Sequence, residues 1–159
     1  GVPARPIYDF SLAVERVAAA VEAVRRLPVP YVLTARAENF LHGRTDLDDT
    51  IKRLQAFEKA GAEVLFAPGL RTLEQIRTVC GSVSRPVNVV MGLVGIDLSV
   101  QQLAEAGVKR ISLGSSLARL ALAAALRAGK EIREQGSFGY ARDALSSAEA
   151  NGLMRGKGA

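Results

Sequence analysis

The feature that most constrains the fold is a repeated unit, a short apolar strand followed by an amphipathic helix. The expected strands end near Arg36, Phe66, Met91 and Leu113, at intervals close to the roughly 30 residues per unit of a (β/α)8 barrel. Each strand is apolar without strict alternation, which is typical of parallel strands buried on both faces. The repeat therefore predicts an α/β fold with a right-handed parallel sheet.

Apolar periodicity and capping residues predict the individual elements. Capping boxes beginning at Thr45, Thr72 and Ser99 mark three of the helix starts. Strands are expected at 31–35, 63–66, 87–91 and 110–113, and helices at 10–24, from 46, from 72, from 99, at 115–135 and at about 140–149.

A closed barrel of this kind needs about eight strands, and the sequence supplies half of them. We therefore expect a TIM-type (β/α) barrel of which about the C-terminal half is present, at residues 1–136. A C-terminal helix and tail at 137–159 would then dock on another subunit. The chain starts with Gly1 and a loop-like segment rather than Met, which favours a piece of a longer enzyme. The alternative is a four-stranded open sheet that is complete in itself.

Composition limits the function classes. The chain of 159 residues is 48% hydrophobic and 23% charged, which excludes disorder. Its net charge of +5 comes from dispersed basic residues without Trp, so we expect no nucleic acid partner and instead a field that attracts small anions. No apolar run approaches the roughly 18 residues of a membrane span. The single cysteine, Cys80, fits a reducing compartment, so a cytoplasmic protein without a membrane partner is predicted.

Charged and amide side chains follow directly after the first strand. Arg36, Glu38, Asn39 and Arg44 are predicted to bind substrate, since parallel sheets present site residues at their carboxyl ends. The guanidinium fork of Arg36 suits a carboxylate or phosphate, although a structural ion pair with Glu38 is an alternative. Asn39 would serve equally well as a loop or capping residue, and Arg44 as a solvated charge. His42, the only histidine, is an acid–base candidate or a solvated loop residue.

Other candidate sites are weaker. The turn Gly114–Ser116 would suit a phosphate at a helix N-terminus, but helix capping by its hydroxyls is favoured. Apart from Asp48 and Asp49 there is no grouped set of carboxylates, histidines or thiols for a metal. If a metal is used, we expect its ligands to lie outside this chain.

Four segments of the chain carry a family resemblance: Thr34-Ala-Arg-Ala-Glu-Asn-Phe-Leu41, Gly43-Arg-Thr-Asp-Leu-Asp-Asp-Thr-Ile51, Ala60-Gly-Ala-Glu-Val-Leu-Phe-Ala-Pro-Gly69 and Arg110-Ile-Ser-Leu-Gly-Ser115. Together they resemble the isocitrate lyase/phosphoenolpyruvate mutase family. The start of the chain, Pro3–Tyr8, resembles the segment after that family's fourth strand.

The resemblance implies a Mg²⁺-dependent barrel enzyme, a lyase or mutase that makes or breaks a C–C or P–C bond beside a small 2-oxo acid or its enolate. Arg36 would match the family's strand-five arginine and hold a carboxylate or phosphonate. The Mg²⁺ ligands, and the gating loop that carries the family's catalytic residues, would lie outside this chain in the absent half, so this chain alone should be inactive. The family's exchange of C-terminal helices implies a homo-oligomer.

One departure concerns substrate. In the lyases that cleave citrate-like substrates the sixth strand leads into Phe-Pro-Glu, whereas Phe66 is followed here by Ala67-Pro68-Gly69. Cleavage of isocitrate or methylisocitrate is therefore not expected. Asn88 lies near a family asparagine, but no role is transferred to it. A non-catalytic α/β domain that binds a small anion or a protein, and a phosphate-binding half-barrel using Gly114–Ser116, stay open as alternatives.

Overall fold

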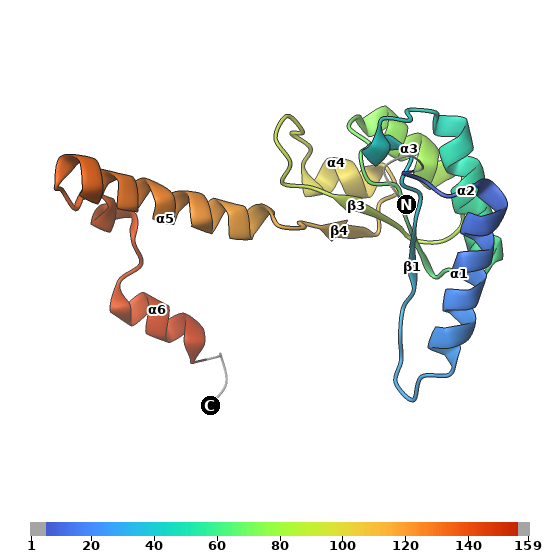
Figure 1. Ribbon diagram of the computed structural model, residues 1–159, viewed down its shortest axis with the longest axis horizontal. Coiled ribbons are helices and arrows are strands. Elements are labelled where there is room, and N and C mark those ends of the chain that lie inside the picture. The colour runs from blue at the N-terminus through green and yellow to red at the C-terminus, as the bar shows by residue number, and fades with distance from the viewer. Residues whose placement is uncertain (1–5, 156–159) are drawn as a thin grey trace. The chain divides into compact units, whose positions relative to one another are not determined.

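A single parallel sheet organises the first part of the chain (Figure 1). In the computed structural model, which describes residues 6–155, its strands pair in sequence order β1-β2-β3-β4, each parallel to the next. They are β1 (Thr34–Arg36), β2 (Val64–Phe66), β3 (Val87–Val90) and β4 (Arg110–Ser112). The predicted α/β class with a parallel sheet of four strands is confirmed.

Helices alternate with these strands. Helix α1 (Phe10–Arg25) precedes the sheet, and α2 (Leu47–Lys59), α3 (Leu73–Gly81) and α4 (Val100–Glu105) join successive strands. A short 3₁₀ helix, η1 (Phe40–His42), lies between β1 and α2. None of the helices described is long and apolar enough to cross a lipid bilayer.

Capping residues set the starts of the connecting helices. Thr72 and Ser99 begin α3 and α4 with complete capping boxes, as predicted. The capping box predicted at Thr45 is wrong by one residue, because Asp46 is the N-cap of α2 and its Oδ1 accepts a hydrogen bond from the Asp49 N–H at 2.9 Å. The extended backbone of Asp46 allows its carboxylate to turn back onto that N–H.

The first strand is shorter than the sequence predicts. Tyr31 and Val32 are more than half exposed, and the ladder starts where Thr34 pairs with Val64. Because β2 itself starts at Val64, the residues before Leu33 have no strand partner in the described structure.

The hydrophobic core lies between the sheet and its connecting helices. It contains Leu65 and Val89 from the sheet, Leu54 from α2, Ile76 from α3 and Leu103 from α4. All of these side chains are nearly inaccessible to solvent. Burial of this kind contributes about 25 cal/mol per Å² of apolar surface, so this packing fixes the strands that present the site.

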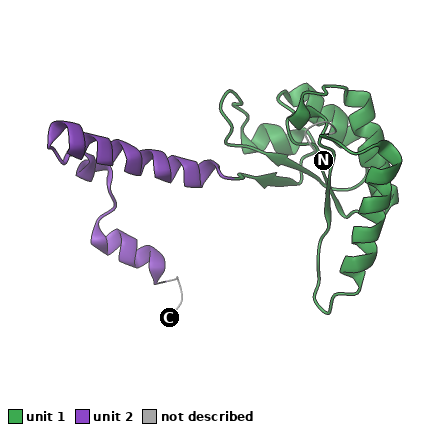
Figure 2. Cartoon of the chain, viewed as in Figure 1, with its two compact units in different colours: residues 1–114 green, residues 115–159 purple. Residues whose placement is uncertain are grey.

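Residues after Gly114 form a second compact unit (Figure 2). It contains α5 (Ser116–Gln135), the 3₁₀ helix η2 (Gly139–Asp143) and α6 (Ser147–Met154). The single helix predicted at 140–149 is wrong: the chain is extended at Ala144, and Ser146 begins a new helix with a capping box to Glu149. The assignment of 137–159 to another subunit stays a prediction, and residues 156–159 lie outside the described range.

Candidate functional site

Arg36 is the last residue of β1, at the carboxyl end of the strand. Its Nε lies 2.7 Å from Glu38 Oε1, and its guanidinium carbon lies 5.1 Å from the centroid of the Phe66 ring. The Arg36 side chain is still 49% exposed. The ion pair and the aromatic face therefore orient the guanidinium, while its terminal N–H groups have no hydrogen-bond partner among the described residues and can bind an anion.

The sheet register explains why Phe66 lies beside Arg36. The two residues are partners in the ladder between β1 and β2, so their side chains project from the same face. Their neighbours Ala35 and Leu65 project from the opposite face into the helix-covered core. The Arg36 guanidinium thus lies on the face of the sheet opposite to that core.

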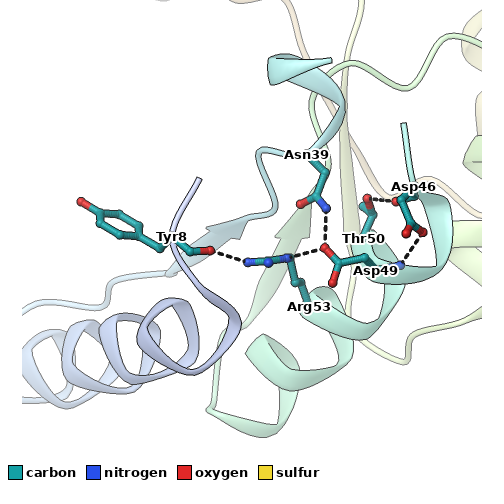
Figure 3. A network of polar contacts seen from close by, with 6 residues as sticks. All are labelled: Tyr8, Asn39, Asp46, Asp49, Thr50 and Arg53. Atoms are coloured by element: carbon teal, nitrogen blue, oxygen red, sulfur yellow. Dashed lines mark hydrogen bonds and ion pairs between the residues drawn. The ribbon is translucent and has the colours of Figure 1, made fainter. Parts of the chain in front are cut away.

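A buried polar network holds the loop that follows Arg36 (Figure 3). Asn39 is 1% exposed, and its Nδ2 donates to Asp49 Oδ2 at 2.6 Å. Arg53 Nε donates to the same carboxylate oxygen at 2.7 Å, and Arg53 Nη1 donates to the Tyr8 carbonyl at 2.9 Å. The network ties the loop to α2 and to the segment before α1.

The network also places Asn39 in the loop role that the sequence allowed. Its Nδ2 is directed to Asp49, and its Oδ1 is buried with no hydrogen-bond partner among the described residues. The backbone carbonyl of Asn39 accepts from the Arg44 N–H at 2.9 Å. A direct contact between Asn39 and substrate stays a prediction.

Electrostatics keep Asp49 ionised. Burial by itself raises the pKa of this carboxyl, but hydrogen bonds from Arg53 and Asn39, together with the charges of Arg53 and Lys52, outweigh it. The net pKa lies below the ordinary value of 3.8. Asp49 is therefore an anionic hydrogen-bond acceptor at neutral pH.

The remaining candidates near β1 are exposed. His42 ends η1, and Arg44 follows Gly43, whose φ of 74° is the left-handed conformation that favours glycine. Neither side chain forms an ion pair among the residues described. The structure therefore brings Glu38 to Arg36 and leaves His42 and Arg44 at the surface of the loop, where their roles stay predictions.

The loop after β2, Ala67-Pro68-Gly69, passes close to η1. Gly69 has a φ of +99°, and a Cβ at this position would lie 2.8 Å from Phe40 Cβ and 2.9 Å from the Phe40 carbonyl carbon. No side chain fits there without moving η1. The close approach of the two loops therefore requires a glycine at this position.

Two further candidate sites lack the expected support. Ser115 is the N-cap of α5 but makes no side-chain capping bond, so the predicted capping role is wrong for that residue. Among residues 6–155 no group of three or more His, Cys, Asp or Glu side chains could hold a metal ion. A cavity of about 860 Å³ between α5 and η2 is lined by none of the predicted site residues.

Sequence reasoning missed three residues of this region. Phe66 is expected only as the end of a strand, and Asp49 and Arg53 only as parts of the helix that starts near residue 46. The sequence did contain a signal that Arg53 is buried and paired. Arg53 directly precedes Leu54, so it lies beside the apolar stripe of its helix, where an arginine needs an acidic partner. Asp49, one helical turn earlier, is that partner.

A sequence profile that describes a whole protein family shows which family the chain belongs to. The profile of phosphoenolpyruvate phosphomutase matches residues 1–133. The chain belongs to the phosphoenolpyruvate phosphomutase family. This confirms the resemblance that the four segments carry, and residues 1–5, which include part of the Pro3–Tyr8 segment, lie outside the described structure.

Individual relatives of this family agree. A 2-methylisocitrate lyase of Aeropyrum pernix is 29% identical over 111 residues, which are 65% of this chain and 36% of that protein. A protein of Burkholderia cenocepacia J2315, provisionally assigned as a lyase/mutase, is 52% identical with a TM-score of 0.90, covering 96% of this chain and 55% of its own. The structure of 2,3-dimethylmalate lyase is 25% identical with a TM-score of 0.75, covering 94% of this chain and 51% of its own.

The phosphomutase-family chain spans about half the length of these solved structures and about a third of the curated lyase. The solved relatives are members of a barrel superfamily, and this chain matches one half of such a fold. The expected fold class is therefore confirmed: a four-stranded part of a TIM-type barrel followed by C-terminal helices.

Proposed function

We propose that this chain is the part of an isocitrate lyase/phosphoenolpyruvate mutase barrel that binds the acidic group of a small 2-oxo acid or its enolate. In the complete enzyme a C–C or P–C bond beside that group would be made or broken. The observation that supports this most is the half-exposed guanidinium of Arg36, which Glu38 and Phe66 hold at the carboxyl end of β1.

The chemistry assigned to Arg36 is binding and orientation. A fixed guanidinium can donate paired, charge-assisted hydrogen bonds to a carboxylate or phosphonate. It also stabilises negative charge that develops on the substrate. Because the guanidinium is already oriented, the site does not have to reorganise during the reaction. Glu38 limits the rotation of the fork, and the Asn39–Asp49–Arg53 network keeps the following loop in place.

The proposal places any metal site outside this chain. The described residues do not fit a metal site, because they contain no cluster of suitable ligands. Mg²⁺, which the family resemblance implies, would take its ligands from residues beyond those described. A homo-oligomer is also proposed on the resemblance.

Relatives name the substrates to test. Phosphonopyruvate hydrolase and oxaloacetate acetylhydrolase, the latter solved with the product oxalate, share the fold, and 2,3-dimethylmalate lyase shares it at 25% identity. The complete enzyme should be assayed with phosphonopyruvate, oxaloacetate, 2,3-dimethylmalate and 2-methylisocitrate. Because no carboxylate follows Phe66 where the citrate-type lyases have Phe-Pro-Glu, we expect the lowest turnover with 2-methylisocitrate.

Arg36→Ala in the complete enzyme tests the role directly. Loss of a hydrogen-bonded charge pair costs about 1.5–3 kcal/mol, so kcat/KM should fall roughly 10- to 150-fold on the best substrate. Arg36→Lys should recover only part of this, because an ammonium lacks the planar fork. Arg77→Ala, at an exposed arginine of α3, is the matched control. Unchanged turnover and unchanged substrate binding in Arg36→Ala would refute the role.

A non-catalytic anion-binding domain is the second candidate, since the half-exposed guanidinium could hold an anion without any reaction. It predicts that the complete protein binds oxalate through Arg36 but turns over none of the four substrates. Turnover of any one of them excludes it.

A further inference from the structure

Arg53 of α2 is the only charged residue that is buried among residues 6–155. Its side chain is 9% exposed. Burial of a charge removes its hydration, and well-packed apolar residues of similar volume often stabilise a fold as well as a buried ion pair does, or better. The value of an arginine at this position therefore lies in the groups that its hydrogen bonds connect.

The guanidinium of Arg53 joins two segments that are distant in the sequence (Figure 3). Its Nη1 donates to the Tyr8 carbonyl at 2.9 Å, and its central carbon lies 5.8 Å from the ring centroid of Phe10, the first residue of α1. Its Nε donates to Asp49 Oδ2 at 2.7 Å, and the same oxygen accepts from Asn39 Nδ2 at 2.6 Å. The entry to α1 and the loop after β1 are thus both fixed through one side chain.

Asn39 depends on this link for its side-chain contacts. Its Nδ2 donates to Asp49, and its Oδ1 is buried without a hydrogen-bond partner among the described residues. Asp49 is in turn held by Arg53. Loss of that arginine would leave the carboxylate without its cationic partner, so the hydrogen bond to Asn39 should no longer be held in place.

Glu38 lies between two fixed points of the chain. On one side the Ala37 N–H donates to the Phe66 carbonyl at 2.9 Å, and on the other side Asn39 is held by the network. The backbone of Arg36 is fixed by the strand ladder, but its Nε takes its direction from Glu38 Oε1 at 2.7 Å. A shift of the loop at Asn39 would therefore move the Glu38 carboxylate and leave the Arg36 backbone in place.

We infer that Arg53 is a positioning residue for the proposed reaction. Through Asp49 and Asn39 it holds the loop that carries Glu38. Glu38 in turn sets the direction of the Arg36 guanidinium. The inference rests on the proposed function for Arg36. Arg53 itself is buried, so it acts on the ligand only through these residues.

A double-mutant cycle in the complete enzyme tests the inference, with kcat/KM on the best substrate as the readout. Arg53→Lys keeps a positive charge beside Asp49 but loses the planar fork that reaches both of its partners. It should lower kcat/KM roughly tenfold in the otherwise unaltered enzyme. In the Glu38→Gln background it should change kcat/KM less than about twofold, because its effect passes through Glu38. Arg77→Lys, at an exposed arginine of α3, is the matched control and should change neither value.

A merely structural role of Arg53 predicts a different result. Arg53→Lys would then lower kcat/KM by the same factor in both backgrounds, and this result, or an unchanged kcat/KM, overturns the inference. Hydrogen exchange of the peptide that covers residues 37–44 gives a readout without turnover. Its amides should exchange faster in Arg53→Lys than in Arg77→Lys, and equal rates would also overturn the inference.

Asn39→Ala replaces Arg53→Lys should that variant not fold, because it keeps the Arg53–Asp49 pair and the hydrogen bond to Tyr8. It should lower kcat/KM in the otherwise unaltered enzyme and have little further effect in the Glu38→Gln background. An equal loss in both backgrounds would mean that Asn39 acts independently of Glu38, which contradicts the inference.

Failure of the inference and failure of the proposed function give different results. If Arg36→Ala leaves turnover and substrate binding unchanged, the proposed function is wrong, and the inference that depends on it is wrong as well. If Arg36→Ala lowers kcat/KM as expected but Arg53→Lys has equal effects in both backgrounds, only the inference is wrong.

Discussion

Single residues decide how the loop after β1 is held. Arg36 is oriented by one carboxylate and one aromatic ring, and neither contact buries it. Asn39 and Arg53 are instead almost fully buried, and both bind the same oxygen of Asp49. The exposed ion pair should contribute little to stability, so Glu38 serves orientation, whereas removal of Asp49 would leave two buried polar groups without their acceptor.

The stability of the fold should therefore depend on Asp49 in a pH-dependent way. Its pKa is lower in the folded chain than its ordinary value of 3.8, so its stabilising effect is full above that value and is lost as the pH falls through the folded pKa. Relative to the unaltered chain, Asp49→Asn should be destabilised at pH 7, and the difference should shrink below about pH 4. Urea unfolding at several pH values measures this, with exposed Asp48→Asn as the control. A difference that does not vary with pH would contradict the expectation.

Secondary-structure elements are delimited by local hydrogen bonds that the sequence encodes. Thr72 and Ser99 each bond the backbone of a glutamine in the first turn, and that glutamine bonds back. These bonds satisfy N–H groups that a helix leaves unpaired. The starts of α3 and α4, and with them the lengths of the loops after β2 and β3, follow from this chemistry.

Thr72→Ala should lower the free energy of unfolding by about 1 kcal/mol, the usual effect of losing an N-cap. Thr72→Ser keeps the hydroxyl that accepts from the Gln75 N–H at 3.2 Å and should behave almost as the unaltered chain. Unfolding must be compared at one protein concentration, because association shifts apparent stability. Equal stability of the Ala and Ser variants would show that the capping bond contributes nothing.

At the scale of the whole molecule, the sheet ends in two edge strands. The order β1-β2-β3-β4 leaves one edge of β1 and one edge of β4 without a strand partner in the described structure. Such edges expose backbone N–H and C=O groups that can pair with another chain. A barrel closes both edges, so a half-barrel and a self-sufficient open sheet differ in this respect.

We expect the isolated chain of 159 residues to self-associate. Sedimentation velocity over a range of concentrations should show dimers or larger species whose fraction rises with concentration. The complete enzyme is the control, and its assembly should not involve these edges. A monomer that unfolds cooperatively at every concentration would favour the self-sufficient sheet and weaken the half-barrel interpretation.

Much of the fold could be predicted from the sequence, because its local signals agree with one another. The strand–helix repeat gave the parallel sheet, and Thr72 and Ser99 gave the starts of α3 and α4. The helix expected at 140–149 does not form as one element. The chain is extended at Ala144, and Ser146 begins a new helix as its N-cap.

Less of the candidate site was predictable. Arg36 and Glu38 are close in sequence, so their ion pair could be anticipated. The contacts of Arg36 with Phe66 and of Arg110 with Asn88 depend on the strand register, which apolar strands without alternation do not specify. The network from Asn39 to Tyr8 likewise depends on how α1 packs beside α2.

A crystal structure of the complete enzyme with oxalate is the most direct test of the central claim, that the Arg36 guanidinium binds the acidic group of the ligand. The account predicts oxalate oxygens within hydrogen-bond distance of the terminal nitrogens of Arg36, with Glu38 still bound to Nε. Oxalate bound elsewhere, with Arg36 turned away from it and held only by Glu38, would contradict the account.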